Sequence, residues 1–192
     1  MLDLLIDFDK LLFRAINTGM GNDLFDAVLP WLREGKLWAP LYLFLASFLW
    51  VNYRRRGLIV GIGLILSVGL TDFTSGTLIK KNVQRVRPCN DPSMEMQIIE
   101  RVPCGSGYSF TSNHSANHFA IASFLIVLFG QTGRTIRYAA VFWAGSIAFS
   151  QVYVGVHYPL DALCGALLGT LIGSATGEWV KKKYLLNELS LN

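Results

Sequence analysis

Long stretches with almost no charged residues constrain this chain more than any other feature of its sequence. Five of them approach the roughly 20 residues that a helix needs to cross a hydrocarbon layer about 30 Å thick. They contain only Asp72, Asp161 and Glu178 as charged residues, and they occupy residues 37–53, 57–79, 115–133, 138–158 and 159–180. A soluble bundle of buried helices is the alternative, but with 16% charged residues the chain has too little polar surface for one. We predict an all-α, polytopic integral membrane helix bundle with about five transmembrane helices.

Residues 1–35 have a different pattern, in which apolar residues recur at helical spacing between charged ones. The repeat predicts an amphipathic helix that lies in the membrane interface. Its apolar residues are Leu4, Leu5, Phe8, Leu11, Leu12 and Ile16. A second interfacial helix is predicted at 22–31, with Asn22 or Asp23 near its N-terminus. If the first helix crosses the membrane instead, the chain has one more span and a cytoplasmic amino terminus.

Basic residues in short loops predict the orientation of the chain, because such loops face the cytoplasm. The basic clusters are 54–56, Arg134 with Arg137, and 181–183. With five spans, all three clusters lie on the same side of the membrane. We therefore predict one domain, 1–192. Interfacial helices occupy 1–35, and the membrane core occupies 36–180, within which 81–114 form a periplasmic loop. Residues 181–192 form a cytoplasmic tail.

Polar residues that suit phosphate chemistry gather near the outer ends of the predicted spans. They are Lys80, Arg87, Ser112, His114, His157 and Asp161. Ionisable groups at membrane depth are costly, so their convergence indicates a site. Each has a simpler explanation alone, because a lysine snorkels at a helix end, an interfacial histidine fills space and an aspartate caps a helix. The net charge of +4 is explained by the basic loops that set the topology and by the outer cations of an anion site. We therefore predict no nucleic acid as partner.

The spacing of these residues resembles the three-part motif of the type 2 phosphatidic acid phosphatase superfamily. The family pattern is K-x6-R-P, P-S-G-H and S-R-x5-H-x3-D. The chain reads Lys80-x6-Arg87-Pro88, then Thr111-Ser112-Asn113-His114, then Ser150-Gln151-x5-His157-x3-Asp161. The three parts occur in the family order, each at the end of a predicted span, and the resemblance covers residues 36–180.

The resemblance implies a role for each of these residues. His157 would attack phosphorus and form a phosphohistidine, with Asp161 orienting its ring. His114 would protonate the leaving oxygen and then activate water. The phosphate oxygens would be held by Lys80, Arg87, Ser112, Asn113 through its backbone amide, and Gln151. No metal or other cofactor is implied, and the sequence has no His and carboxylate cluster with metal-ligand spacing.

The chain departs from the family motif at three positions. Thr111 replaces the proline. Asn113 replaces the glycine, and asparagine tolerates left-handed backbone better than most residues. Gln151 replaces the arginine, so one cationic phosphate contact is lost, although the amide still donates a hydrogen bond. The candidates to compensate for this loss are Arg85 and Arg101.

The predicted function is that of an integral-membrane lipid phosphatase in the bacterial inner membrane, with its site on the periplasmic face. Its partner would be a lipid phosphate: lipid A 1-phosphate, undecaprenyl pyrophosphate, phosphatidylglycerophosphate or phosphatidic acid. Two other functions fit the same residues. One is a phosphotransferase that passes the phosphoryl group to a second lipid. The other is a non-hydrolytic lipid-phosphate binder or transporter, which Gln151 favours. Neither the head group nor the oligomeric state follows from the sequence.

Three features outside the motif carry structural predictions. In an oxidising periplasm Cys89 and Cys104 would form a disulfide, with two free thiols as the alternative. Asp72 is expected to hold helices together through hydrogen bonds, with hydroxyl partners among Thr71, Thr74 and Ser75. The small-xxx-small spacing that lets two helices approach closely is found at Gly165, Gly169 and Gly173.

Overall fold

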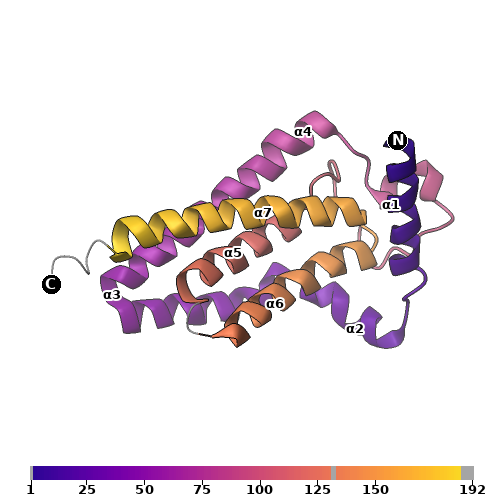
Figure 1. Ribbon diagram of the computed structural model, residues 1–192. Coiled ribbons are helices and arrows are strands. Elements are labelled where there is room, and N and C mark those ends of the chain that lie inside the picture. Colours follow the sequence, from indigo (N-terminus) through magenta and orange to yellow (C-terminus); the bar gives the residue numbers. More distant parts are fainter. Residues whose placement is uncertain (1, 131–132, 187–192) are drawn as a thin grey trace.

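The computed structural model of the chain describes residues 2–130 and 133–186 (Figure 1). All regular secondary structure in these residues is helical, which confirms the all-α prediction. The α-helices are α1 Leu2–Asn17, α2 Asp23–Leu32, α3 Gly35–Phe73, α4 Lys80–Val83, α5 Asn113–Phe129, α6 Arg134–Tyr153 and α7 Pro159–Val180. Short π turns occur at Thr74–Ile79 and Lys181–Leu186. Short 3-10 turns occur at Pro88–Asn90 and Pro92–Met94. The predicted tail falls outside the described residues from residue 187 onward.

Helix α3 consists of two arms that meet in a sharp reversal at Arg54. This residue has φ 46° and ψ −120°, and the chain turns back so tightly that a Cβ on Gly57 would lie 2.0 Å from the carbonyl oxygen of Leu49. The predicted basic cluster 54–56 therefore forms the turn itself. The second arm continues through the π turn into α4, and this continuation places Lys80 at the far end of the arm.

The close packing of α5 against α7 is the most extensive helix contact in the described chain. A Cβ on Gly169 would lie 2.0 Å from the carbonyl oxygen of Ala116, and one on Gly173 would lie 2.3 Å from that of Ala120. Only glycine allows the two backbones to approach this closely. The prediction from the small-xxx-small spacing is confirmed, and the contact brings the first turn of α5 next to the first turn of α7.

The fourth predicted span, 138–158, is wrong at its outer end because α6 stops at Tyr153. Gly155 follows with φ 95°, a left-handed conformation that glycine adopts without a steric penalty. The chain then turns toward α7, which begins at Pro159. His157 therefore lies in the loop between α6 and α7, where its ring is held by loop contacts rather than by a helix.

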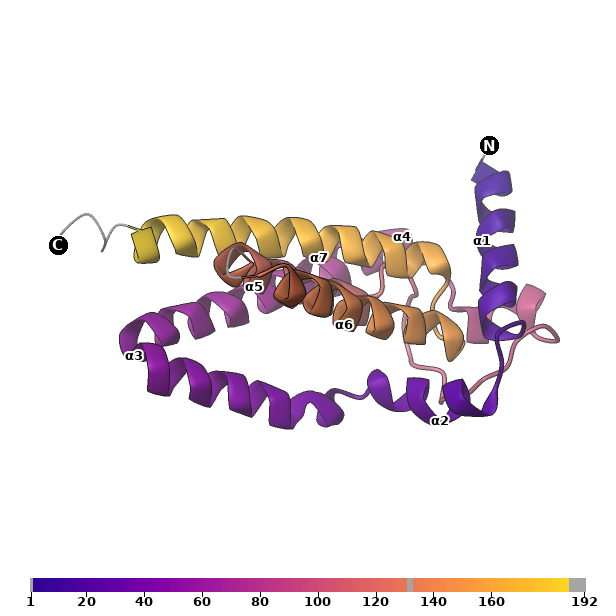
Figure 2. The ribbon, with the colours of Figure 1, turned by 60° about the horizontal axis from the view of Figure 1, so that its bottom comes forward.

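The amino-terminal helices cover the end of the bundle at which α6 meets α7. Figures 1 and 2 both show α1 running across this end, at a steep angle to α7. Its inner face carries Phe13, which packs edge-on against Tyr158 with ring centroids 5.4 Å apart. Its apolar residues Leu4, Leu5, Phe8, Leu11 and Leu12 are exposed. The helix is amphipathic as predicted, and its position in the membrane interface stays a prediction. Asn22 is the N-cap of α2, accepting a 2.9 Å hydrogen bond from the backbone of Phe25.

Large apolar side chains point outward along the length of the helices. Leu43 on α3, Phe142 on α6 and Leu171 on α7 are each 70% exposed or more, a surface typical of helices that face lipid. Two stretches qualify as membrane spans by length and composition, Gly35–Met94, which contains both arms of α3, and Pro159–Tyr184. The count of five spans stays a prediction.

Candidate active site

A cavity of about 350 Å³ contains most of the predicted site residues. It is lined by Arg33, Lys80, Arg87, Gly105, Ser106, Asn113, His114, Gln151 and His157. Of the predicted site residues, only Ser112 and Asp161 are not in its lining. None of the described residues that line it is acidic, so its charged side chains are all cationic. Nowhere in the described chain do three or more His, Cys, Asp or Glu side chains form a group that could hold a metal ion.

The two ring nitrogens of His157 have different partners. The Nη1 atom of Arg87 donates to Nε2 at 3.3 Å and to the carbonyl oxygen of Val156 at 3.1 Å. A guanidinium can only donate, so Nε2 is the unprotonated nitrogen and Nδ1 carries the proton. Burial lowers the pKa of His157 to about 4, because an apolar environment disfavours the charged ring. The ring is therefore neutral at pH 7, with its Nε2 lone pair directed at the guanidinium of Arg87.

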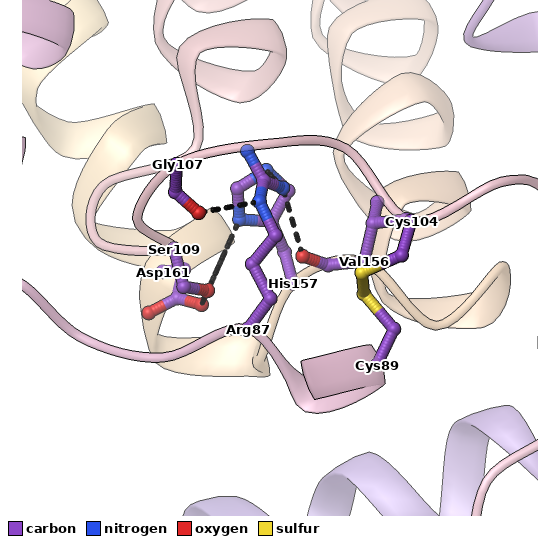
Figure 3. The surroundings of a disulfide bond; sticks show 8 residues. All are labelled: Arg87, Cys89, Cys104, Gly107, Ser109, Val156, His157 and Asp161. Atoms are coloured by element: carbon purple, nitrogen blue, oxygen red, sulfur yellow. Dashed lines mark hydrogen bonds and ion pairs between the residues drawn. A yellow bond between two sulfur atoms is a disulfide. The ribbon is translucent and has the colours of Figure 1, made fainter. Parts of the chain in front are cut away.

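A serine that the motif does not include lies between His157 and Asp161 (Figure 3). The Ser109 hydroxyl is 3.4 Å from Nδ1 of His157 and donates a short hydrogen bond to Oδ2 of Asp161. The direct separation of Nδ1 and Oδ2 is 3.7 Å, which is beyond hydrogen-bond range. Ser109 therefore lies beside both Nδ1 of His157 and the carboxylate of Asp161, and the orienting role of Asp161 stays a prediction.

Asp161 is buried and accepts hydrogen bonds on both carboxylate oxygens. Its Oδ1 accepts from Nη1 of Arg85 at 2.7 Å, and its Oδ2 accepts from the backbone N–H of Tyr158 at 2.8 Å. The second bond is part of a capping box at the start of α7. The structure therefore shows the simpler explanation for Asp161, helix capping, and ring orientation by the same side chain stays a prediction.

Arg85 connects this carboxylate to the amino-terminal helix. Its Nη2 donates to Oδ2 of Asp9 on α1 at 2.6 Å, and its guanidinium lies 4.1 Å from the ring centroid of Tyr158. Asp9 is buried and also accepts from the backbone N–H of Leu160 at 2.8 Å. Both ends of the guanidinium are thus occupied by carboxylates. Arg85 is committed behind His157 and does not compensate for Gln151 in the cavity.

The first turn of α5 is fixed by hydrogen bonds to its neighbours. The Ser112 hydroxyl caps the helix by accepting from the backbone N–H of Ser115, and the Ser112 N–H donates to the carbonyl oxygen of Asp161 at 3.0 Å. The Asn113 amide donates to Asp72 at 2.9 Å and accepts from Ser75 at 2.8 Å. The first N–H groups of a helix have no partner within it, and two residues of this first turn, Asn113 and His114, line the cavity.

Asp72 links α3 to α5 as predicted, but through different partners. Its Oδ1 accepts from the side-chain amides of Asn113 at 2.9 Å and Asn117 at 3.1 Å. The hydroxyls of Thr71 and Thr74 instead bond back to carbonyl oxygens one turn earlier in their own helix. Local spacing could not distinguish these possibilities, because the asparagines come from another helix.

A disulfide closes the segment 89–104, which begins two residues after Arg87 (Figure 3). It joins Cys89 to Cys104, whose Cα atoms are 5.9 Å apart. On the far side of this link, Nε of Arg87 donates to the carbonyl oxygen of Gly107 at 3.2 Å. The guanidinium of Arg87 is therefore fixed from two sides, beside the ring of His157.

The position at which the motif has arginine is occupied by a buried glutamine with no internal partner. Gln151 is 0% exposed, and neither its Oε1 nor its Nε2 has a hydrogen-bond partner within the described residues. Arg101, the second candidate to compensate, is engaged elsewhere, since it pairs with Asp26 and donates to the carbonyl oxygens of Asn17 and Tyr153. The additional cation in the cavity is Arg33, which the motif spacing could not reveal.

Comparison with known proteins identifies the family of this chain. The profile of the PAP2 superfamily matches residues 56–185. Lipid A 4'-phosphatase of Bacteroides thetaiotaomicron is 29% identical over 172 residues, which are 88% of this chain and 75% of that protein. Undecaprenyl-diphosphatase of Sulfolobus acidocaldarius is 26% identical over 171 residues, 87% of this chain and 76% of that protein. The chain belongs to the PAP2 superfamily, and its class is that of a phosphatase.

Two solved structures have a similar fold. The crystal structure of Aquifex aeolicus LpxE matches with a TM-score of 0.65 at 25% identity, over 87% of this chain and 93% of that one. The transmembrane PAP2-type phosphatidylglycerolphosphate phosphatase of Bacillus subtilis matches with a TM-score of 0.72 at 21% identity, over 95% of this chain and 89% of that one. The helical architecture is therefore that of membrane-embedded PAP2 phosphatases.

Proposed function

We propose that this chain is an integral-membrane phosphatase that removes phosphate from a lipid phosphate or pyrophosphate through a phosphohistidine on His157. The observation that carries the proposal is the state of this ring, which has a neutral Nε2 at a cavity whose charged groups are all cationic. Such a cavity attracts a phosphate group and neutralises the charge that develops on it. A neutral imidazole nitrogen beside it is a competent nucleophile.

The chemistry would proceed in two displacements at phosphorus. Nε2 of His157 attacks as the bond from phosphorus to the lipid oxygen breaks. Burial lowers the pKa of His114 to about 4, and the negative charge of a bound phosphate opposes this shift. His114 would therefore take up a proton with the substrate and give it to that oxygen. In the second displacement His114 takes a proton from water, whose oxygen attacks phosphorus as the N–P bond breaks. Inorganic phosphate leaves, and both histidines return to their starting protonation states. Ser109 and Asp161 would stabilise the positive ring that exists while the N–P bond persists.

An apolar groove supports a lipid as the substrate. It has a volume of about 380 Å³ and lies between the two arms of α3 and α5, with Tyr42, Leu45, Ile65 and Ile121 among its lining residues. The Tyr42 hydroxyl is 3.3 Å from Nε2 of His118, whose Nδ1 donates to the carbonyl oxygen of His114 at 2.7 Å. Acyl or prenyl chains in this groove would leave the phosphate near the cavity. Lipid A 1-phosphate, undecaprenyl pyrophosphate, phosphatidylglycerophosphate and phosphatidic acid all present such a group.

The location that fits this function is the bacterial inner membrane, with the site facing the periplasm. The basic clusters at the opposite end of the bundle favour this orientation, and a disulfide in the loop of the site is typical of an oxidising compartment. Labelling of an introduced cysteine near position 3 from each side of the membrane tests both the orientation and the number of spans.

The decisive experiment is a phosphate-release assay on the purified chain in detergent, without added metal, over the four candidate lipids. We expect His157→Ala to lower release by about 10³-fold or more, and His114→Ala to be similarly impaired. Cys164→Ala, in α7 and outside the cavity, is the matched control and should keep full activity. Full activity of His157→Ala would exclude the phosphohistidine. Product analysis with two lipids present separates hydrolysis from transfer to a second lipid.

A non-hydrolytic lipid-phosphate binder is the second candidate, and Gln151 is the observation that favours it. Its uncharged amide lines the cavity at the position where the motif has an arginine. A binder would retain phosphate lipids tightly and release no phosphate, and the variant Gln151→Arg would also release none. Release by the unaltered chain rules the binder out.

A further inference from the structure

The cavity contains a cation that the family motif does not include. Arg33 lines it together with Lys80 and Arg87, and is close enough to Arg87 and His114 to interact with them electrostatically. Its Nε is buried and has no hydrogen-bond partner within the described part of the chain. A buried guanidinium nitrogen without a partner is costly. Such a group is expected in a site where an anion binds.

Arg33 and Gln151 both line the cavity, from segments that pack against each other. Arg33 is the C-cap residue of α2, with its backbone N–H bonded to the carbonyl oxygen of Trp31. The indole N–H of Trp38 donates to the carbonyl oxygen of Leu32 at 2.8 Å and fixes the junction between α2 and α3. Helix α2 packs against α6, the helix that carries Gln151. The two side chains reach the cavity from adjacent helices that are held together.

The two residues are complementary in what each lacks. Gln151 has the position of the motif arginine but no charge, and both of its amide atoms are without a partner among the described residues. Arg33 has the charge but comes from outside the motif, more than one hundred residues earlier in the sequence. Arg85 and Arg101 are not available, because each is paired with carboxylates outside the cavity.

We propose that Arg33 supplies the cationic phosphate contact that Gln151 cannot make, and that the Gln151 amide donates a neutral hydrogen bond to the same phosphate group. The inference rests on the proposed function, since it assigns a further residue to the same site. A guanidinium binds two phosphate oxygens with a planar fork. The substrate class is a lipid-linked phosphate or pyrophosphate, and Arg33 contacts its phosphate rather than its lipid.

The test is an exchange of the charge between the two positions. Arg33→Ala is expected to lower kcat/KM for phosphate release about 10- to 100-fold, the range for loss of a charge-assisted hydrogen bond. Gln151→Arg in that background is expected to restore at least a third of the unaltered value. The matched control is Lys36→Ala, which removes an exposed cation three residues away and should stay within twofold. Arg33→Lys, which keeps the charge but not the fork, should be intermediate.

Two results would overturn the inference. One is an Arg33→Ala variant that stays within twofold of the unaltered chain. The other is a double variant no more active than Arg33→Ala although Gln151→Arg alone is active. If Gln151→Arg prevents folding, the double variant is replaced by a rescue experiment, in which phosphate release by Arg33→Ala is measured with added guanidinium ion. Restored activity supports the inference, and no restoration contradicts it.

Binding measurements separate this inference from the proposed function. In a His157→Gln background, which cannot turn over, the probes are inorganic phosphate and phosphatidic acid in mixed micelles. Adding Arg33→Ala should weaken the binding of both probes about tenfold or more. If only phosphatidic acid binds more weakly, Arg33 contacts the lipid and the inference is wrong. If the unaltered chain releases no phosphate but Arg33→Ala weakens the binding of both probes, the proposed phosphatase function is wrong and the proposed phosphate contact of Arg33 still holds.

Discussion

The two sides of the His157 ring differ in how completely their polar groups are paired. Behind the ring, Asp161 accepts from Arg85, Ser109 and the backbone of Tyr158, and Arg85 is held in turn by Asp9. In front of the ring, the amide of Gln151 and Nε of Arg33 have no hydrogen-bond partner in the described residues. Both sides are largely buried, so the contrast does not arise from access to water.

The contrast separates two tasks within one site. Groups that orient a nucleophile must be held by the protein itself, because conformational freedom left in the resting site has to be given up, at an entropic cost, to reach the transition state. Groups that bind a phosphate must instead keep their donors available until the phosphate arrives. Substitutions behind the ring should therefore affect kcat and stability, whereas substitutions in front should affect mainly substrate binding.

The largest effect is expected behind the ring, from Asp161→Asn. The amide keeps the shape of the carboxylate but cannot accept on both sides, so Arg85 and Ser109 lose their common acceptor. We expect kcat to fall about 10⁴-fold, a loss typical of an orienting aspartate, with KM nearly unchanged. Steady-state kinetics on the purified chain measure both. A fall in kcat of less than tenfold would contradict the orienting role.

A smaller effect is expected from Asp9→Asn, which loosens the same network one residue further away. Arg85 would keep Asp161 but lose its second carboxylate, and we expect kcat to fall about tenfold, as for one charge-assisted hydrogen bond. Asp7→Asn changes an exposed acid on the same helix and should have no effect. Equal behaviour of the two variants would show that α1 does not act on the site.

The buried ring itself should make stability depend on pH. His157 has a pKa of about 4 in the folded chain and an ordinary value near 6.5 when unfolded. Between these values the unfolded chain binds the extra proton, so the folded state loses stability as pH falls from 6.5 toward 4. Thermal melting in detergent should show this loss, reduced in His157→Gln. Identical pH dependence in both chains would contradict the low pKa.

The smallest effect is expected in front of the ring, from Gln151→Leu. This change removes two buried polar atoms that have no partner in the described chain, so it should leave the melting temperature unchanged or raise it slightly. The neutral hydrogen bond to substrate would also be lost, and KM should rise up to about tenfold while kcat changes less. A clear fall in melting temperature would mean that Gln151 belongs to the paired side.

The spacing of motif residues predicted much of the site, and local patterns predicted much of the fold. Lys80, Arg87 and His157 line one cavity, as expected from the order and spacing of the motif, and the glycines of α7 allow the predicted close contact. The missed contacts join distant segments, because Ser109 lies 52 residues from Asp161, and Arg85 lies 76 residues from both Asp9 and Asp161. Periodicity describes one helix at a time, so it carries no information on such pairs.

Arg33 and the end of α6 illustrate two further limits. Arg33 follows an interfacial helix and has no spacing relation to the motif, so only the packing of α2 on α6 could place it in the cavity. Uncharged residues continue to Tyr158, whereas α6 ends at Tyr153 and Gly155 turns the backbone away. Hydropathy indicates which residues tolerate lipid, but the glycine conformation decides where the helix stops.

The bond between Asp9 and the backbone of Leu160 joins residues 151 positions apart, and this has a consequence for biosynthesis. Asp9 leaves the ribosome first and must wait for almost the whole chain before its partners exist. Insertion of the last span would therefore be the step that completes the network behind His157. A nascent or truncated chain would carry His157 without this support, so the proposed phosphatase activity would begin only after synthesis and insertion have finished.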